Sequence, residues 1–289
     1  LDKFNFSYDF KSSTELYKKG FFDETIKLVM QNYESILSII LPTLREERKE
    51  TYSPFLPICA KTNKVLQVKI EEYNIKDNSI IYKDPQNNKL IEKSVLSGEC
   101  KLQWKVDWAM RWIALEVDYE MCGKDLTDSV KLGSMICKKL GNKPPINLIY
   151  EMFLDQNGEK ISKSKGNGIS IDEWLRYSTP ESLSLFMFQR PKSAKKLHFD
   201  VIPKCSDEYL NFNKNFHEDK TYKKMDNPAW HIHFGKPPKI DSSITFNTLM
   251  NLVSVCNSVE PKIIWSFINE YNPKLIPFKN EYINNQIKY

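Results

Sequence analysis

The sequence predicts an α/β fold, preceded by a β-rich insertion and followed by a C-terminal α-helical bundle. Short β-rich runs alternate with turn sequences in the first third, and strand-like and helix-like segments alternate between about 100 and 165. Beyond 170, helix signals dominate. At 289 residues the chain is long enough for about two domains of ~150 residues. We expect it to divide into residues 1–97, 98–170 and 171–289.

Composition places the chain among folded globular proteins. Hydrophobic residues make up 41% and charged residues 27%, which excludes global disorder. The longest strongly apolar stretch, 36–41, ends at Pro42 and is far shorter than the ~20 residues of a membrane-spanning helix, so we expect no membrane partner. No targeting segment is visible, and the chain begins with Leu1 rather than Met, which suggests a fragment or a processed chain.

Charge and cysteine usage give weaker indications. A net charge of +5 and a pI of about 8.7 favour a polyanionic partner without identifying one. The 6 cysteines are widely spaced and form no C-x-x-C pair, which favours reduced thiols and a cytoplasmic location.

The first third of the chain begins with a helix and continues into strands. Apolar residues recur at helical spacing over 23–41, and Pro42 should end that helix. The mixed charges at 45–50 indicate a solvated surface. The runs 65–68, 80–82 and 89–91, separated by turn sequences at 74–78 and 84–88, predict a small antiparallel β-module.

The middle of the chain predicts an α/β layer. Tryptophans recur every four residues from Trp104 to Trp112, and a helix over 127–140 should end at Gly141. An apolar, strand-like run over 146–154 follows and leads into the turn at 155–158.

The C-terminal region contains clear helix starts. Ser170 and Glu173 have the spacing of a capping box, and Thr179 precedes a proline at a first helical position. Helix-spaced apolar residues over 246–255 and 262–271 complete the prediction of a helical bundle.

The octet 160–167, Lys-Ile-Ser-Lys-Ser-Lys-Gly-Asn, carries the strongest functional signal. Its lysines repel one another, so we expect the loop to be mobile until an anion binds. A triphosphate suits it, because ammonium groups can stabilise charge that develops during phosphoryl chemistry. A solvated basic loop is the alternative, but the five-residue pattern arises by chance in only about one chain in a thousand of this length.

The octet resembles the KMSKS signature of class I aminoacyl-tRNA synthetases, with Ile161 in place of Met. Other segments resemble class I lysyl-tRNA synthetases in order and spacing, and the resemblance covers nearly the whole chain. These segments are Trp-Lys-Val-Asp-Trp-Ala-Met-Arg-Trp at 104–112, Gly-Lys-Asp at 123–125, Pro-Pro at 144–145, Tyr-Glu at 150–151, Pro-Glu-Ser-Leu at 180–183 and Asp-Glu-Tyr at 207–209.

The resemblance implies both a fold and an activity. Residues 1–97 would be the connective-peptide insertion, 98–170 the second half of a Rossmann-like catalytic domain with the KMSKS loop, and 171–289 a stem-contact and partial anticodon-binding helical bundle. The implied reaction is ATP-dependent activation of lysine to lysyl-adenylate, followed by transfer to tRNA(Lys). Because metal-bound pyrophosphate leaves, Mg²⁺ is implied together with ATP.

The resemblance also implies the roles of particular residues. Lys160 and Lys163 would be catalytic and contact the ATP phosphates, and Asp125 would bind the ribose or the substrate amine. Ile161, Ser162 and Ser164 would complete the ATP-binding loop.

The substrate lysine calls for carboxylates and an aromatic face. The residues that supply these groups are Trp104, Asp107, Tyr150 and Glu151, and the resemblance adds Gly123 to the substrate-binding residues. An ion pair or a helix cap is the alternative role for Asp107 and for Asp125. Trp108 and Trp112 are expected in the core.

The chain departs from the family pattern at several places. The upstream H-x-G-H or H-x-G-N signature is absent, and His231-Ile-His-Phe-Gly235 lies after the loop in the wrong order. Leu126 stands where many relatives carry His. Zinc is unlikely, because Cys59 has no second cysteine at C-x-x-C spacing and should be a semi-buried thiol.

These departures predict a fragment that lacks the half with the first signature, so this chain alone should be inactive. The alternative function is a truncated, catalytically inactive remnant that at most binds tRNA. The lysines that would serve it are 192, 195, 196, 214, 220, 223 and 224, for which a solvated face is the competing interpretation. Another nucleotidyl-transferring enzyme, or a synthetase for another amino acid, is a weaker alternative.

Overall fold

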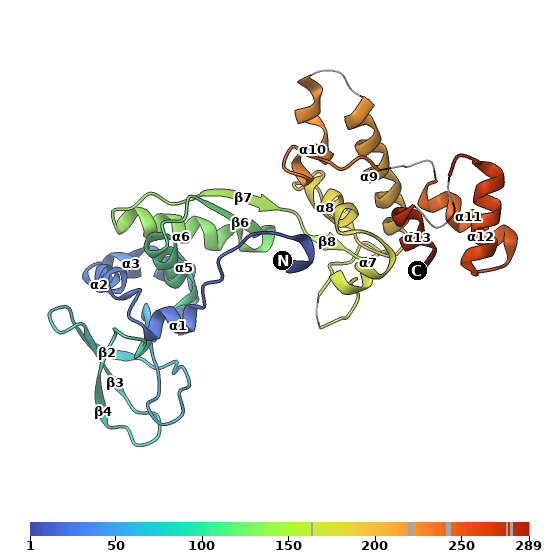
Figure 1. Ribbon diagram of the computed structural model, residues 1–289. Helices are drawn as coiled ribbons and strands as arrows, with labels where there is room; N and C mark the ends of the chain where they lie inside the picture. The colour runs from blue at the N-terminus through green and yellow to red at the C-terminus, as the bar shows by residue number, and fades with distance from the viewer. Residues whose placement is uncertain (163, 219–221, 241–243, 276, 278–279, 289) are drawn as a thin grey trace. The chain divides into compact units, whose positions relative to one another are not determined.

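The chain divides into two compact units in a computed structural model that describes every residue except 163, 219–221, 241–243, 276, 278–279 and 289 (Figure 1). One unit is Asp9–Tyr150, and the other combines Leu1–Tyr8 with Glu151–Tyr289. The mixed α/β class is confirmed. The functional divisions at 97/98 and 170/171 stay predictions. None of the described helices is long and apolar enough to cross a membrane.

Four helices build the core of the unit Asp9–Tyr150 (Figure 1). Phe22, Ile36, Met110 and Ile136 are fully buried in it and come from the α2, α3, α5 and α6 regions. The helices of this unit are α1 (Ser13–Lys18), α2 (Asp23–Gln31), α3 (Tyr33–Ile40), α4 (Glu46–Lys49), α5 (Trp104–Ala114) and α6 (Thr127–Lys139). Its strands are β1 (Phe55–Pro57), β2 (Ile70–Asn74), β3 (Ser79–Lys83), β4 (Leu90–Ser94), β5 (Cys100–Leu102), β6 (Tyr119–Gly123) and β7 (Ile146–Tyr150).

The single helix predicted over 23–41 is wrong, because the chain breaks at Asn32 into α2 and α3. The Asn32 side-chain amide donates to the carbonyl of Leu28 at 2.9 Å. Asparagine competes in this way for backbone groups that a continuous helix would use. The helical spacing of apolar residues continues from α2 into α3, so this spacing could not predict the interruption at Asn32.

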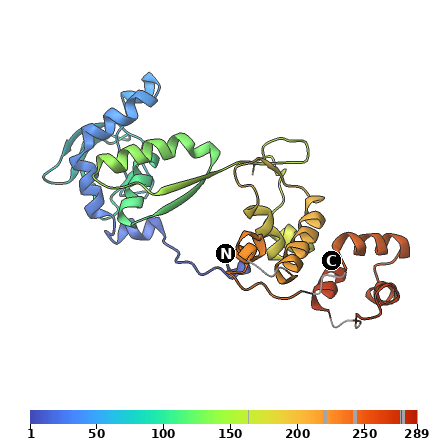
Figure 2. The same ribbon diagram turned by 90° about the horizontal axis from the view of Figure 1, so that it is seen from above.

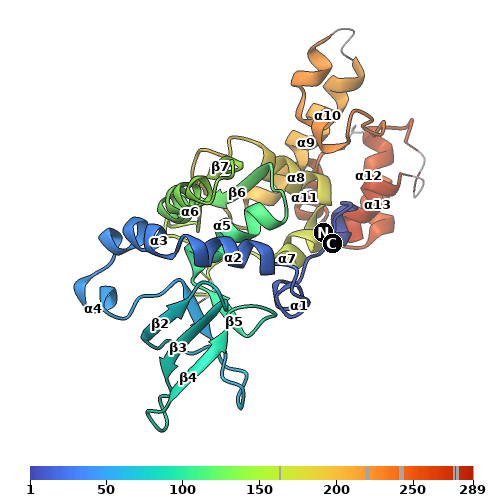
Figure 3. The same ribbon diagram turned by 90° about the vertical axis from the view of Figure 1, so that its left-hand side faces the viewer.

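The small antiparallel module is confirmed as the sheet β2-β3-β4 (Figure 3). Its first strand was misplaced: 65–68 is not a strand, and β2 begins at Ile70. Instead, the amide of Leu66 donates to the carbonyl of Pro57 at 2.8 Å, after a turn with Asn63 at φ 54°. The apolar run 65–68 therefore continues beside the end of β1 rather than entering the sheet.

The α/β layer is a parallel pair, β6 and β7, joined through α6 (Figure 2). The predicted helix end is confirmed, since Gly141 follows α6 with φ 79°. A Cβ atom on Gly133 would lie 3.1 Å from the Trp112 ring, so the absence of a side chain there allows α5 and α6 to pack closely.

In the second unit, helices enclose two smaller cores, one containing Trp174 and Phe186 and one containing Trp265 and Ile268. The helices are α7 (Ile171–Tyr177), α8 (Pro180–Phe188), α9 (Val201–Glu218), α10 (Pro228–Ile232), α11 (Phe246–Cys256), α12 (Pro261–Tyr271) and α13 (Glu281–Lys288). The strands β8 (Phe153–Leu154) and β9 (Lys195–Lys196) pair in parallel.

Both helix starts predicted in this unit are confirmed. Ser170 and Glu173 form the capping box of α7, and the Thr179 hydroxyl accepts from the amide of Ser182 at the start of α8. A buried chain of hydroxyls ties these helices to α9. The Trp174 indole donates to Ser182 at 3.0 Å, and Ser178 bonds both Ser182 at 2.8 Å and Ser206 at 2.5 Å.

Two predictions for this region are wrong in detail. The run 146–154 is two strands, β7 and β8, which belong to different units. Between them the amide of Glu151 donates to the carbonyl of Pro191 at 2.9 Å, so the backbone changes its pairing partner there. The strand β9 also interrupts a stretch that was expected to be helical.

Candidate functional site

The signature loop is organised around the side chain of Asn167. Its amide nitrogen donates to Asp155 Oδ2 at 2.8 Å, and its amide oxygen accepts from the backbone N–H of Ser162 at 3.1 Å. Asp155 Oδ1 in turn accepts the amides of Asn157 and Glu159, both at 2.9 Å. These bonds join the turn at the start of the loop to the signature that follows it.

The hydrogen bond from Asn167 is the main reason why the pKa of the Asp155 carboxyl lies below its usual range, and the amide of Glu159 acts in the same direction. Asp155 and Asn167 were not predicted as site residues. The turn sequence beginning at Asp155 was recognised, and an Asx turn of this kind is the signal that would have found the first of them.

Ile161 anchors the signature to the unit. Its backbone amide donates to the carbonyl of Phe153 in β8 at 3.1 Å, and Lys160 forms an isolated antiparallel bridge with Leu154. A Cβ atom on Gly168 would lie 2.6 Å from Ile161 Cγ2. The isoleucine that replaces the family's methionine therefore packs directly against a glycine, and a side chain at position 168 would force Ile161 to shift.

Of the described polar residues of the signature, Lys160 and Ser164 are exposed and Ser162 is half-buried. The hydroxyls of Ser162 and Ser164 are 3.3 Å apart. Lys165 is paired with Glu159 at 2.9 Å, and this bond raises the pKa of the lysine. Lys163, predicted to be catalytic, lies outside the described residues.

The other predicted residues belong mostly to the unit Asp9–Tyr150, where a cleft of about 360 Å³ lies beside β6 and α5. Trp104, Gly123 and Tyr150, three of the residues predicted to bind the substrate lysine, line it. Leu126 also lines it and gives that wall an apolar surface. Residues that were not predicted complete the lining: Trp108, Arg111, Trp112, Leu115, Val117, Glu120, Met121 and Cys122.

Gly123, Asp125 and Tyr150 lie close together, and Gly123 and Tyr150 line this cleft. Gly123 and Tyr150 are partners in the β6–β7 pair. A Cβ atom on Gly123 would lie 2.8 Å from Asp125 Oδ1 and 3.6 Å from the Tyr150 ring. The structure thus places Tyr150 beside the segment 123–125, and the absence of a side chain at position 123 leaves the space that Asp125 Oδ1 occupies.

The three tryptophans of α5 form a stacked ladder. The centroids of the Trp104 and Trp108 rings are 5.0 Å apart, and those of Trp108 and Trp112 are 5.1 Å apart. Trp108 and Trp112 are buried, which confirms their expected place in the core, whereas Trp104 is 47% exposed. Of the three tryptophans, Trp104 is the one that offers a large ring surface to a ligand.

Glu120 holds this ladder from β6. A single carboxylate oxygen accepts the indole N–H of Trp112 at 2.7 Å and that of Trp108 at 3.2 Å. Tyr119 and Met121 on either side are exposed. Period-two alternation therefore turns Glu120 toward the helix, and an inward-facing carboxylate on a strand is the signal that would have identified it.

Asp107 lies in the core rather than in the cleft lining. It is 4% exposed, accepts the Tyr17 hydroxyl at 2.6 Å and pairs with Arg111 at 2.9 Å. Burial, and then the charge of Asp107, raise the pKa of the Tyr17 phenol. This is the ion pair that the sequence left open as the alternative role. The substrate role of Asp107 stays a prediction.

The remaining predicted residues, Glu151 and the signature loop, belong to the second unit. Each unit therefore carries its own group of candidate residues: the aromatic cleft in one and the loop in the other.

Lys195 is not available as a solvated phosphate-binding lysine. Its ammonium donates to the carbonyls of Phe186, Met187 and Gln189 at the end of α8, and it lies 4.8 Å from the centroid of the Phe186 ring. Desolvation lowers the pKa of this ammonium. A cation at a helix C-terminus satisfies carbonyls that have no partner within the helix.

The two histidines after the loop also form hydrogen bonds within the fold. His233 bonds the Tyr209 hydroxyl at 2.7 Å, and His231 bonds the carbonyl of Met225 at 2.8 Å. Burial lowers the pKa of His233. These contacts give both histidines a structural role.

No three metal-ligating side chains of the described residues lie together as a metal site would need. Cys59 is half-buried, as expected. Its hydrogen bonds, foremost that with the Thr62 side chain, lower the pKa of the thiol.

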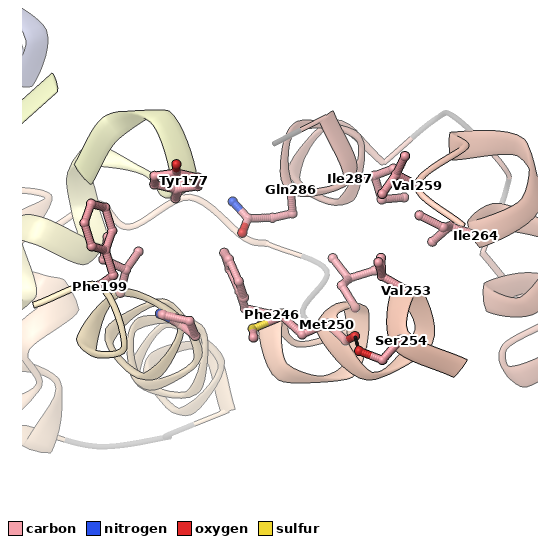
Figure 4. Close-up of a pocket in the computed structure, with 13 residues that line it drawn as sticks. Tyr177, Phe199, Phe246, Met250, Val253, Ser254, Val259, Ile264, Gln286 and Ile287 are labelled. Atoms are coloured by element: carbon pink, nitrogen blue, oxygen red, sulfur yellow. Dashed lines mark hydrogen bonds between the residues drawn. The ribbon is translucent and has the colours of Figure 1, made fainter. Parts of the chain in front are cut away.

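A larger cleft of about 700 Å³ lies away from the signature residues, in the second unit (Figure 4). Tyr177 and Phe199 form one side, and Phe246, Met250 and Val253 of α11 face them. Its lining is mainly apolar and contains none of the residues predicted for a site.

Comparison with known proteins agrees with the sequence signals. The family model described as tRNA synthetases class I (K) matches residues 1–236. Lysine--tRNA ligases of Rickettsia africae (strain ESF-5) and Rickettsia bellii (strain OSU 85-389) are each 54% identical over the whole chain, which covers 56% of each relative. That of Rickettsia felis (strain ATCC VR-1525 / URRWXCal2) is 53% identical, with 55% covered. The chain belongs to the class I tRNA synthetase family and spans about half the length of the curated relatives it matches.

Proposed function

We propose that this chain belongs to a lysine–tRNA ligase, which activates lysine with ATP and transfers it to tRNA(Lys) in the cytoplasm. The observation that carries the proposal is the 54% identity with lysine--tRNA ligases over the whole chain. The anchored signature loop and the aromatic cleft supply the two kinds of site that the reaction needs, one for phosphates and one for an amino acid.

The loop acts on ATP. Lys160 and Lys163 bind the phosphates, and their charges stabilise the pyrophosphate that leaves when the lysine carboxylate attacks the α-phosphorus. Ile161 anchors the loop, while Ser162 and Ser164 offer hydrogen bonds to the nucleotide. Mg²⁺ binds together with ATP and would neutralise part of the negative charge of the phosphates.

The cleft acts on lysine. Trp104 presents an exposed ring, which attracts an ammonium group by the cation–π interaction. Gly123 leaves room for Asp125 beside Tyr150, so that the carboxylate can bind the ribose or the amine. Asp107 fixes Arg111 next to the Trp104 ring. Glu151 is a further candidate for binding the substrate lysine.

The larger architecture follows the same proposal. The β6-α6-β7 layer with the loop is the second half of a Rossmann-like domain, and residues 1–97 are the connective insertion. The helices of 171–289 form a stem-contact and partial anticodon-binding bundle that binds tRNA(Lys).

The test is ATP–pyrophosphate exchange by the protein at its full natural length. We expect exchange that depends on lysine, and a loss of several-fold to about a thousandfold in Lys163→Ala with little change in stability. Exchange supported by another amino acid but not by lysine would exclude the proposed substrate. Absence of exchange, together with salt-dependent binding of tRNA, would favour the inactive tRNA-binding alternative.

A further inference from the structure

Glu120 carries a negative charge that no cation of the described residues balances. It lines the cleft, and its hydrogen bonds come from the neutral indoles of Trp108 and Trp112. Both indoles bond the same oxygen, Oε2. The second oxygen, Oε1, accepts no hydrogen bond from the described residues of the chain. A carboxylate in a largely apolar cleft is costly unless it is paired, so a cationic partner is expected.

The other charged side chain in the lining of the cleft, Arg111, already has a partner. Arg111 is paired with Asp107, whose second oxygen accepts the Tyr17 hydroxyl. Asp107 thus has one partner on each oxygen and is buried behind the helix. Of these two carboxylates, only Glu120 both faces the cleft and keeps an oxygen for a ligand.

The indole bonds also fix the direction of the Glu120 carboxylate. Two indole N–H groups on helix α5 donate to Oε2, so that the carboxylate is oriented without a ligand. Trp104, stacked on Trp108 in the same ladder, adds an exposed aromatic face to the cleft. A positioned carboxylate beside an aromatic face is a good receptor for a primary ammonium.

We infer that Glu120 is the specificity-determining carboxylate of this cleft, and that its free oxygen binds the side-chain ammonium of the substrate lysine. This inference rests on the proposed function and deepens it. In this assignment Glu120 on β6 selects lysine, and Asp107 orients Arg111.

Norleucine tests this assignment, because it is lysine without the side-chain ammonium. Binding of lysine and of norleucine to the full-length protein is measured by calorimetry for the wild type and for Glu120→Gln. Glutamine keeps an oxygen that accepts from the indoles but removes the charge. We expect the preference for lysine over norleucine to fall about 10- to 100-fold, while the affinity for norleucine stays within about twofold.

Two further variants separate selection from folding. Glu116→Gln removes an exposed carboxylate just before β6 and should leave the preference unchanged. Glu120→Asp retains the charge and should keep some of the preference. Thermal unfolding of all the variants shows whether the indole ladder is intact.

The outcomes distinguish a failure of the Glu120 assignment from a failure of the proposed function. If the wild type prefers lysine and Glu120→Gln prefers it equally, or if Glu120→Gln loses both ligands in equal measure, Glu120 does not bind the ammonium and the proposed function still stands. If the wild type shows no preference for lysine, both the assignment and the proposed substrate are wrong.

Discussion

Asn167 is the residue on which the shape of the signature loop depends. Replacing it with alanine removes the donor to Asp155 and the acceptor for the Ser162 amide. Each lost bond costs about 0.5–1.5 kcal/mol, and the loop loses the link between its two ends. We expect Asn167→Ala to lower lysine-dependent pyrophosphate exchange at least about tenfold, because correct placement of catalytic groups carries much of an enzyme's rate.

Asn157→Ala is the matched control for this variant. Asn157 lies in the same loop, and its contact with Asp155 uses only the backbone amide. Its replacement should leave the exchange rate within about twofold of the wild type. Equal losses in the two variants would show that Asn167 has no special role.

Gly123 is a second residue with a specific steric role. Alanine at this position places a Cβ 2.8 Å from Asp125 Oδ1, so the carboxylate must move. The backbone φ of −69° suits any residue, so the cost is expected at the site rather than in the fold. We expect Gly123→Ala to reduce kcat/KM for lysine about tenfold, with a change in unfolding free energy below ~1 kcal/mol.

A double-mutant cycle with Asp125→Ala identifies the cause of this loss. If the glycine acts through Asp125, the second substitution should add little to the effect of Asp125→Ala. Fully additive losses would mean that position 123 affects the substrate by another route.

At the scale of the element, the capping box of α7 gives a pH dependence. The Glu173 carboxylate accepts hydrogen bonds from the backbone N–H and the hydroxyl of Ser170, both at 2.8 Å. The hydrogen bond from the backbone N–H is the main cause of the lowered pKa of Glu173. A carboxyl whose pKa is lower in the folded state stabilises the fold above its unfolded pKa of about 4.3. That stabilisation is lost as the pH falls through the lower, folded value.

Glu173→Gln isolates this charge, because glutamine also serves in a capping box. We expect the wild type to have the higher Tm between about pH 5 and 7, and the difference to shrink below about pH 4. The measurement is thermal unfolding by circular dichroism as a function of pH. Glu181→Gln, in the first turn of α8, controls for the loss of a surface charge; a difference that grows toward low pH would contradict the assignment.

At the scale of the whole molecule, the unit Asp9–Tyr150 has a core of its own. Buried side chains of α2, α3, α5 and α6 and of the neighbouring strands meet there. We expect the fragment 9–150 to unfold in one cooperative thermal transition, with tryptophan emission typical of buried indoles, since Trp108 and Trp112 are buried.

The fragment 9–126 is the comparison for this experiment. It lacks α6 and so removes Val130, Ile136 and Cys137 from the core. It should show no cooperative transition. If 9–150 also unfolds without cooperativity, the core of this unit is not sufficient for folding.

Local sequence signals predicted most element types and several of their ends. Capping residues such as Ser170 and Thr179 act within one helical turn, so their effect is visible in a short segment. The misplaced strand at 65–68 and the unseen break at Asn32 have another origin. At both places the structure depends on which hydrogen-bond partner a backbone group has, and the spacing of apolar residues carries no information about that partner.

The candidate site divides in the same way. Trp104, Gly123, Asp125 and Tyr150 were predicted from their residue types and their resemblance to a family, and three of them line one cleft. Glu120 and Asn167 were missed, because a carboxylate or an amide joins a site only through the partners that the fold brings to it.

The sequence by itself determined the α/β class, the signature loop and the family, because these depend on residue types at fixed spacing along the chain. Only the tertiary structure decided which carboxylate faces the cleft. Asp107 and Glu120 are both carboxylates, and the sequence does not distinguish their surroundings. In the fold, Asp107 contacts an arginine and a tyrosine hydroxyl, whereas Glu120 contacts two neutral indoles. That difference arises because charge balance is set by neighbours in space, which local sequence does not specify.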